Sequence, residues 1–203
     1  MTLKKYHCVP TIHAQPIVDN LQLRETMAMA GARRWRAAGA YMLVLSGKVG
    51  TGKSLAAAWA AADYLRATAT ENPWGRLVYF SGRLWVSSPH LSRFAPWSEE
   101  LVELEAADFL VIDDLGEEEA TPRTLATISS LLTTRDSNAR PTIITTNLDG
   151  ATFKSRYGER IIDRLRQSGT SDGKADWWIR CTEESLRGRI EPQPKLREVE
   201  DTQ

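Results

Sequence analysis

The stretch Gly47-Lys48-Val49-Gly50-Thr51-Gly52-Lys53-Ser54 decides the fold of this chain. It satisfies the pattern G-x-x-x-x-G-K-[ST] and lies between an apolar run at residues 41–46 and an alanine-rich segment at residues 53–67. A strand, a glycine-rich loop and a helix in this order form the context that a phosphate-binding loop requires. The alternative is a glycine-rich turn with a chance lysine, which the flanking patterns disfavour. The stretch therefore predicts a P-loop that binds a nucleoside triphosphate.

The whole loop, residues 47–54, is the predicted nucleotide-binding segment. Its glycines let successive backbone N–H groups turn inward around the phosphates, and the first turn of the following helix adds its positive dipole end. Lys53 is expected to reach the β and γ phosphates, and the hydroxyl of Ser54 is expected to bind Mg²⁺. We therefore predict ATP and Mg²⁺ as the cofactors.

Two carboxylates follow the apolar run at residues 109–112. Asp113 and Asp114 stand where a buried strand ends, and strand ends of a parallel sheet lie beside the phosphate loop. In this Walker B pattern Asp113 would hold Mg²⁺, and Asp114 would orient or deprotonate the water that attacks the γ-phosphate. Alone, the pair fits two solvated turn residues before Leu115 as well. Its combination with the phosphate loop favours the catalytic interpretation.

A polar residue ends the next apolar run, at residues 142–146. The amide of Asn147 suits a neutral contact with the attacking water or the γ-phosphate. An ordinary turn asparagine before Asp149 and Gly150 is the alternative. The order of phosphate loop, acidic pair and polar strand tip favours a catalytic role for Asn147.

Short apolar runs alternate with helical patterns along the chain. Buried strands are predicted at residues 41–46, 76–81, 108–112, 142–146 and 177–181. Helices are predicted at residues 21–38, 53–67, 98–107 and 121–135. This alternation predicts an α/β fold with a mainly parallel five-stranded sheet, flanked by helices on both faces.

The composition fits one compact domain. The 203 residues are 42% hydrophobic and 26% charged, and Lys plus Arg balance Asp plus Glu at 26 each. No net charge therefore draws the whole molecule onto nucleic acid or a membrane. Only Cys8 and Cys181 occur, which disfavours a disulfide framework, and the nearby His7 and His13 lack a fourth metal ligand. No apolar stretch approaches the ~20 residues of a membrane span, so we expect a cytoplasmic protein without membrane contact.

Four motifs together resemble the AAA+ ATPases of the DnaC/DnaI helicase-loader and IstB transposition-helper group. They are the loop at residues 47–54, Val111-Ile112-Asp113-Asp114-Leu115-Gly116, Ile143-Ile144-Thr145-Thr146-Asn147, and Tyr157-Gly158-Glu159-Arg160-Ile161-Ile162-Asp163-Arg164-Leu165-Arg166. Many nucleotide-binding proteins share the first motif, whereas the last is much more specific to loaders. The resemblance covers residues 20–190 and implies a P-loop NTPase fold of the AAA+, ASCE type.

The resemblance also assigns roles to arginines. The family arginine that matches Arg164 is an arginine finger in the ATP site of a neighbouring subunit, so a homo-oligomer with Arg164 at its interface is implied. Arg160, one helical turn earlier, shares that face and is the second candidate. Helix chemistry alone favours a solvated surface on which both arginines pair with Glu159 and Asp163. Arg187 matches the family's sensor 2 arginine, which contacts the γ-phosphate in the same subunit, and a surface arginine near a tail is the alternative.

The prolines and charges at its two ends divide the chain into an N-terminal arm of residues 1–20, an ATPase domain of residues 21–190 and a charged tail of residues 191–203 that is expected to be disordered. Two features depart from the family pattern. The segment after the last strand is too short for a full C-terminal helical lid domain, and the arm is far shorter than the helicase-binding domain of a DnaC-like loader. The candidate partners are a replicative helicase or transposase-like protein and single-stranded DNA.

Two stretches combine basic and aromatic residues as a DNA contact would require. They are residues 33–36 with Trp35, and residues 83–97 with Trp85 and Phe94. Both signals are weak, because a tryptophan on a helix is more often packed than stacked on a base. Packing is therefore the preferred interpretation of these rings.

The expected function is slow ATP hydrolysis, stimulated by assembly or a partner, in which the ATP state controls self-assembly and binding of DNA or a partner protein. One alternative is a nucleotide-gated adaptor with little turnover. A second is a small-molecule P-loop kinase, which usually has an arginine-rich lid after the third helix. The corresponding residues 133–141 contain only Arg135 and Arg140, which disfavours the kinase.

Overall fold

The structure is a computed structural model that describes residues 13, 23–70, 85–95, 97–167 and 176–186. The predicted strand at residues 76–81, the tail at residues 191–203 and Arg187 lie outside the described residues. So does the predicted arm, except for His13. The division into arm, ATPase domain and tail is therefore not tested.

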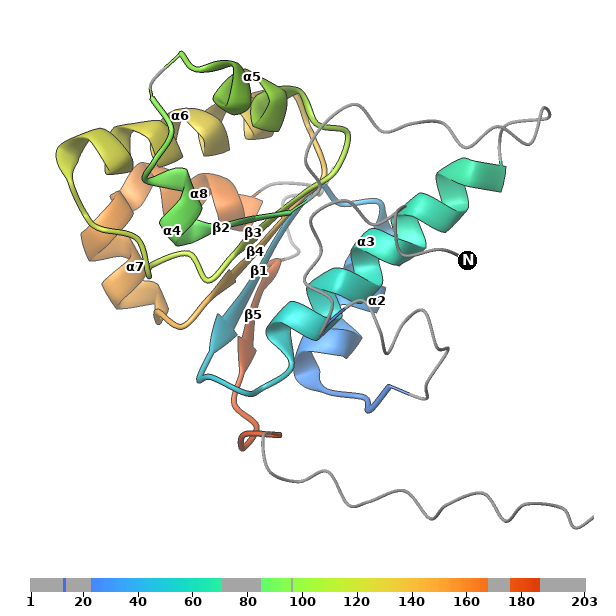
Figure 1. The fold of residues 1–203 in the computed structure, drawn as a ribbon. Helices are drawn as coiled ribbons and strands as arrows, with labels where there is room; N and C mark the ends of the chain where they lie inside the picture. Colours follow the sequence, from blue (N-terminus) through green and yellow to red (C-terminus); the bar gives the residue numbers. More distant parts are fainter. Residues whose placement is uncertain (1–12, 14–22, 71–84, 96, 168–175, 187–203) are drawn as a thin grey trace, which may run out of the picture.

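The described strands form one five-stranded sheet in which every hydrogen-bonded pair is parallel (Figure 1). The strands are β1 (Met42–Gly47), β2 (Trp85–Ser87), β3 (Leu110–Asp113), β4 (Thr142–Thr146) and β5 (Trp178–Cys181). Their order in the sheet is β2-β3-β4-β1-β5. The predicted α/β fold with a parallel five-stranded sheet is thus confirmed. Because β4 lies between β1 and β3, the carboxyl ends of the loop strand, the polar strand and the acidic strand are neighbours.

Strand β2 is one of the elements that the sequence did not predict, as are the helices at residues 88–91 and 150–157. Residues 83–97 were considered only as a DNA-contacting stretch, yet Trp85–Ser87 pairs in register with β3. Trp85 and Val86 are 5% and 4% exposed, so they are core residues of this edge strand. The strand is only three residues long, which is too short for a period-two pattern to show.

The helices are α2 (Met27–Ala38), α3 (Lys53–Thr70), α4 (Ser88–Leu91), α5 (Glu99–Ala106), α6 (Pro122–Ser137), α7 (Gly150–Tyr157) and α8 (Glu159–Gln167). The predicted caps Ser98 and Thr121 are confirmed, since both side chains accept a helix amide. The predicted start of the first helix at residue 21 is wrong. Thr26 accepts the Met29 amide at 3.1 Å and so begins α2 at Met27, and Gly39, in the left-handed region, ends it.

Helices cover both faces of the sheet (Figure 1). Because side chains alternate along a strand, Leu43 and Leu45 of β1 pack into the core against α2 and α3. Met42 and Val44 of the same strand pack into the core on the other face, where α5, α6, α7 and α8 lie. The central strands β1, β3 and β4 are therefore buried on both faces, as continuous apolar runs in a parallel sheet require, whereas the edge strand β5 is partly exposed.

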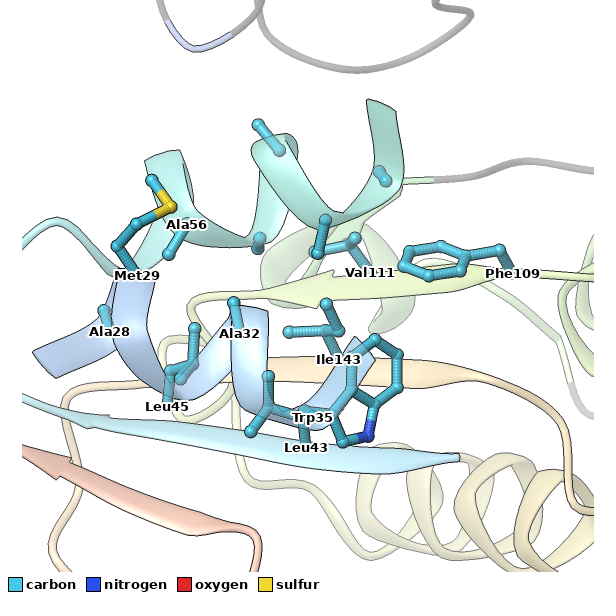
Figure 2. Packing of buried hydrophobic residues seen from close by; sticks show 14 of the residues in the cluster. Ala28, Met29, Ala32, Trp35, Leu43, Leu45, Ala56, Phe109, Val111 and Ile143 are labelled. Carbon is cyan, nitrogen blue, oxygen red and sulfur yellow. The ribbon is translucent and has the colours of Figure 1, made fainter. Parts of the chain in front are cut away.

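The core on the α2 and α3 side is built from small side chains around one large ring. Figure 2 shows Ala28, Ala32 and Ala56 between the helices and the sheet, with Trp35 beside Phe109. The Trp35 and Phe109 rings meet edge to face with centroids 6.1 Å apart. The alanines let α3 lie close to the sheet, and this fixes the amino end of α3 at the end of β1.

Candidate nucleotide site

The loop of residues 47–54 connects the end of β1 to the start of α3, as the motif requires. Gly47 has φ +149° and Gly50 has φ +87°. Both positions require glycine, because residues outside the loop lie where a Cβ atom would be. A Cβ on Gly47 would lie 2.2 Å from the Cys181 carbonyl oxygen, and one on Gly50 would lie 2.1 Å from Ser185 Oγ. Strand β5 and the segment after it therefore pack directly against the loop and hold its shape.

Lys53 is the most enclosed charged group of the loop, at 5% exposed. Its Nζ donates to the carbonyl oxygens of Gly47 and Lys48, each at 2.8 Å, and to Asn147 Oδ1 at 3.0 Å. The ammonium group thus lies inside the curve of the loop and contacts the tip of β4. Phosphate oxygens can replace these neutral acceptors as stronger, charged ones.

Ser54 and Asp113 come together from different elements. Ser54 Oγ donates to Asp113 Oδ1 at 2.9 Å, and the carboxylate is 7% exposed at the end of β3. A hydroxyl and a carboxylate are hard oxygen ligands, the type that Mg²⁺ prefers. Because the two groups are in contact, one cation can bind both, and these residues fit the predicted magnesium role.

Thr145 holds both acidic residues. Its hydroxyl donates to Asp113 Oδ1 at 2.6 Å and accepts the backbone amide of Asp114 at 2.9 Å, and the side chain is fully buried. Its carbonyl oxygen accepts the Leu115 amide at 2.8 Å. The neighbouring Thr146 hydroxyl donates to the Leu115 carbonyl oxygen. The tip of β4 therefore shapes the turn that carries the acidic pair.

These two threonines were missed in the site prediction, although a signal existed. Thr145 and Thr146 are hydroxyl side chains at the end of an otherwise apolar strand, where a buried hydroxyl must find a hydrogen-bond partner. The turn they hold includes Asp114 in the left-handed region, with φ 55°, which aspartate tolerates better than most residues.

We expect Thr145→Val to slow ATP hydrolysis about ten- to a hundredfold. Valine has the same shape but no hydroxyl, so the hydrogen bonds to Asp113 and Asp114 are lost. Even a small displacement of these residues at the reacting centre lowers the rate. Affinity for ATP without magnesium should change little, since no phosphate contact is lost. Phosphate release and ATP titration measure the two quantities. Thr145→Ser keeps the hydroxyl and should restore most activity. Parental turnover in the valine variant would exclude this role.

Asn147 lies immediately after β4, where the sequence predicted a polar strand tip. Besides accepting from Lys53, its Nδ2 donates to Glu117 Oε1 at 3.2 Å. Its amide is therefore oriented from both ends, by a cation of the phosphate loop and by an anion of the turn after β3.

The two candidate finger arginines of α8, Arg160 and Arg164, differ in their surroundings. Arg164 Nη1 pairs with Asp136 Oδ2 of α6 at 3.2 Å, and its side chain is 42% exposed. Arg160 is exposed, and no ion pair within the described part of the chain involves it. Both project from the face opposite the buried Ile161 and Leu165. In the alternative interpretation, these arginines pair with Glu159 and Asp163. Among the described residues, Glu159 instead pairs with Lys154, and Arg164 with Asp136.

The segment leading to Arg187 lies against the phosphate loop. The Leu186 amide donates to the Gly50 carbonyl oxygen at 2.8 Å. Ser185 lies over Gly50, and a Cβ on Gly52 would lie 3.6 Å from Leu186 Cδ1. The residue before the predicted sensor 2 arginine is therefore at the nucleotide loop.

Three of the aromatic rings in the two stretches considered for DNA contact are packed inside the protein, whereas Trp97, at the end of the second stretch, is 91% exposed. Trp35, Trp85 and Phe94 are 1%, 5% and 7% exposed. A base cannot stack on rings so enclosed, and the packing interpretation is confirmed for these three. Arg33 and Arg36 of the first stretch stack over Trp59 and Tyr64 of α3, with 5.2 Å from each guanidinium carbon to the ring centroid.

No group of three or more His, Cys, Asp and Glu side chains could hold a metal ion within the described residues. Within the same part of the chain, no helix is long and apolar enough to cross a membrane.

Comparison with known sequences identifies relatives but no family model: none matches the chain. The replicative helicase loader DnaC of Escherichia coli (strain K12) is 29% identical over 150 residues, which cover 72% of this chain and 56% of DnaC. DnaC of Buchnera aphidicola subsp. Acyrthosiphon pisum (strain APS) is 36% identical over 66 residues, which cover 32% of this chain and 27% of that protein. The chain thus spans about half the length of E. coli DnaC.

Several solved structures share the fold. DnaI matches with a TM-score of 0.61 at 21% identity, over 87% of this chain and 96% of that chain. The structure of the DnaC helicase loader matches with a TM-score of 0.59 at 20% identity, over 86% of this chain and 100% of that chain. AMPPCP-bound DnaA from Aquifex aeolicus matches with a TM-score of 0.58 at 14% identity, over 87% of this chain and 51% of that chain. The chain shares its fold, a parallel sheet flanked by helices with the P-loop motif after β1, with these solved structures of DnaI, DnaC and DnaA. Its sequence similarity to DnaC agrees with the resemblance to helicase loaders that the four motifs predicted.

Proposed function

We propose that this chain binds Mg·ATP at residues 47–54 and hydrolyses it, and that the nucleotide state controls its assembly with copies of itself and with partners. The observation that carries the proposal is the convergence of three separate motifs. Lys53 Nζ lies 3.0 Å from Asn147 Oδ1, and Ser54 Oγ lies 2.9 Å from Asp113 Oδ1. A loop cation, a hydroxyl–carboxylate pair and a polar strand tip are what phosphoryl transfer to water needs.

In the proposed reaction, Lys53 exchanges its contacts with loop carbonyls for oxygens of the β and γ phosphates. Ser54 and Asp113 would hold Mg²⁺, which would supply positive charge against the phosphates. Asp114 accepts a proton from the attacking water, and Asn147 holds this water or the γ-phosphate. The products are ADP and phosphate. The placement of Leu186 on the loop supports a contact between Arg187 and the γ-phosphate in the same subunit.

We expect Lys53→Ala to weaken ATP binding about ten- to a hundredfold, which is the value of a charge-assisted hydrogen bond to phosphate. The fold should be retained, because the lysine contacts loop carbonyls rather than the core. Titration of ATP followed by calorimetry measures the change. Lys154→Ala, which removes an exposed lysine of α7 paired with Glu159, is the matched control and should bind normally. Equal affinity in Lys53→Ala would exclude this loop as the phosphate site.

The proposed setting is DNA replication or transposition. The relatives DnaC and DnaI suggest a replicative helicase as the protein partner, and a structure titled replication initiator DnaA bound to AMPPCP and single-stranded DNA suggests DNA as a second one. A transposase-like partner, as for IstB, is the alternative that the motifs also allow. Capture by the chain of a replicative helicase in ATP, and its release in ADP, would test the first partner directly.

Two alternative functions differ from the proposed ATPase. A nucleotide-gated adaptor differs only in having little turnover, whereas a small-molecule kinase usually has an arginine-rich lid. Arg135, in the segment where a kinase lid would lie, is fully buried and donates to the backbone carbonyl oxygens of Leu104, Ala107 and Pro141. Burial lowers the pKa of Arg135 to about 10, yet it stays protonated at neutral pH and ties helices together. It therefore cannot reach a phosphate, which leaves only Arg140 among residues 133–141 for a kinase lid and disfavours the kinase alternative.

A further inference from the structure

Glu118 is a buried carboxylate that the proposed reaction does not use. It is 4% exposed and lies four residues after Asp114. Its two oxygens face different elements. Oε2 accepts the Gly116 amide at 2.8 Å and the Ser88 hydroxyl, whereas Oε1 accepts Arg156 Nε at 3.0 Å and the Tyr157 hydroxyl. The Glu118 backbone carbonyl oxygen also accepts from Arg156.

The carboxylate is held in its ionised form. Burial alone would raise the pKa of Glu118, but hydrogen bonds from Ser88, Tyr157 and the backbone amides of Gly116 and Glu118 hold the pKa below its ordinary value of 4.5. All four groups that contact the Glu118 carboxylate oxygens donate a hydrogen bond to them. If Glu118 were protonated, its own O–H would point at one of these donors. An ionised carboxylate with donors on both sides is a strong link between the segments that supply them.

The two segments that Glu118 joins serve different ATP sites in the proposed reaction. Gly116 lies in the turn that carries Asp113 and Asp114, which serve the subunit's own ATP site. Arg156 and Tyr157 are at the end of α7, separated only by Gly158 from α8 and its arginines. We propose that Glu118 is a positioning residue that fixes the α7–α8 hairpin against the acidic turn, and so sets where the α8 arginines meet a neighbouring subunit.

The loss of Glu118 should act on the hairpin more than on the turn. The turn is also held by Thr145 and Thr146 through bonds that do not involve Glu118. In the described part of the chain, hydrogen bonds from Arg156 and Tyr157 to Glu118 link the hairpin to the turn. This inference rests on the proposed ATPase function and on the α8 arginines acting in trans, and the controls below separate their failure from its own.

A pair of hydroxyl deletions distinguishes positioning from simple stabilisation. Tyr157→Phe and Ser88→Ala each remove one hydroxyl donor from Glu118, and both side chains are buried. A structural role would make both variants lower the melting temperature and affect turnover alike. We expect Tyr157→Phe to lower kcat at least about threefold, the value of one hydrogen bond, with KM for ATP unchanged, and Ser88→Ala to keep parental kcat. Equal kcat in the two variants would overturn the proposal.

Mixing two variants tests whether Glu118 acts on the ATP site of the neighbouring subunit or on its own. Glu118→Gln replaces one oxygen with a donor, so it cannot accept from both segments, and we expect kcat to fall about tenfold or more, as misplaced catalytic groups do. Mixed with Lys53→Ala, which supplies intact α8 arginines, the Glu118→Gln sites should regain activity. Glu119→Gln, an exposed neighbour, is the matched control and should behave as the parent.

The reference mixture contains Lys53→Ala and an Arg160→Ala, Arg164→Ala double variant. If the reference mixture regains activity and the Glu118→Gln mixture does not, Glu118 acts within its own site and the proposal is wrong. If the reference mixture also fails, the trans arrangement is wrong, and with it the role of Glu118 toward a neighbour.

Discussion

Replacing Asp114 with asparagine is expected to leave Mg·ATP binding intact and to reduce hydrolysis about 10²- to 10⁴-fold, the usual contribution of a positioned acid or base. The amide has nearly the shape of the carboxylate but cannot accept a proton from water. The turn should keep its conformation, because it is the backbone amide of residue 114 that bonds to Thr145, at 2.9 Å. Asparagine is also tolerated in the left-handed region that Asp114 occupies.

Phosphate release and ATP titration on the same Asp114→Asn preparation separate turnover from binding. Asp149→Asn is the matched control: Asp149 caps α7 through the Thr152 amide at 2.8 Å, and asparagine caps as well as aspartate. Its hydrolysis should equal that of the parent. If Asp114→Asn hydrolyses ATP at the parental rate, the base is elsewhere, and Glu117, which contacts Asn147, is then the nearest candidate.

Loss of the arginine finger should have an effect of similar or greater size. We expect Arg164→Ala to bind ATP normally and to hydrolyse it about 10³- to 10⁵-fold more slowly at concentrations that favour assembly, the range measured for such arginines. The ion pair with Asp136 is no obstacle. Arg164 is 42% exposed, and a surface pair contributes only about 0–1 kcal/mol, which a contact with phosphate in the next subunit easily exceeds.

Equimolar mixing with Lys53→Ala shows whether this arginine acts across an interface. Each variant supplies the half-site that the other lacks, so activity should return when they co-assemble. Arg160→Ala in the same experiment decides between the two candidate finger arginines, Arg160 and Arg164. Arg166→Ala, which removes an exposed arginine near Asp176, is the control and should hydrolyse ATP like the parent. A co-assembled mixture without recovered activity would mean that Arg164 acts within its own subunit or only pairs with Asp136.

The parts of the site that could be predicted from sequence are those that one continuous segment specifies. The phosphate loop needs glycines, Lys53 and Ser54 in a fixed spacing, and an acidic pair after an apolar run marks the end of a buried strand. Strand–helix alternation then places these ends on one edge of a parallel sheet. The fold prediction rested on the same local patterns and is confirmed.

The residues that were missed depend on pairing between distant segments. Thr145 serves the acidic turn because β4 lies next to β3 in the register Ile112↔Ile144, and Glu118 becomes a link only where α7 meets the turn. In sequence, Glu118 is one of three consecutive glutamates that resemble a solvated surface run. Strand β2 was missed for a similar reason, since pairing with β3 makes Trp85–Ser87 a strand.

One measurement tests most directly whether this chain is an ATPase: the rate of phosphate release from Mg·ATP and water, compared between the parent and Lys53→Ala. It should be made over a range of protein concentrations, with and without single-stranded DNA and with no other phosphate acceptor. We expect release by the parent that rises as the protein assembles, and none above background in Lys53→Ala. Release by the parent that equals that of Lys53→Ala under every condition would contradict the proposed ATPase.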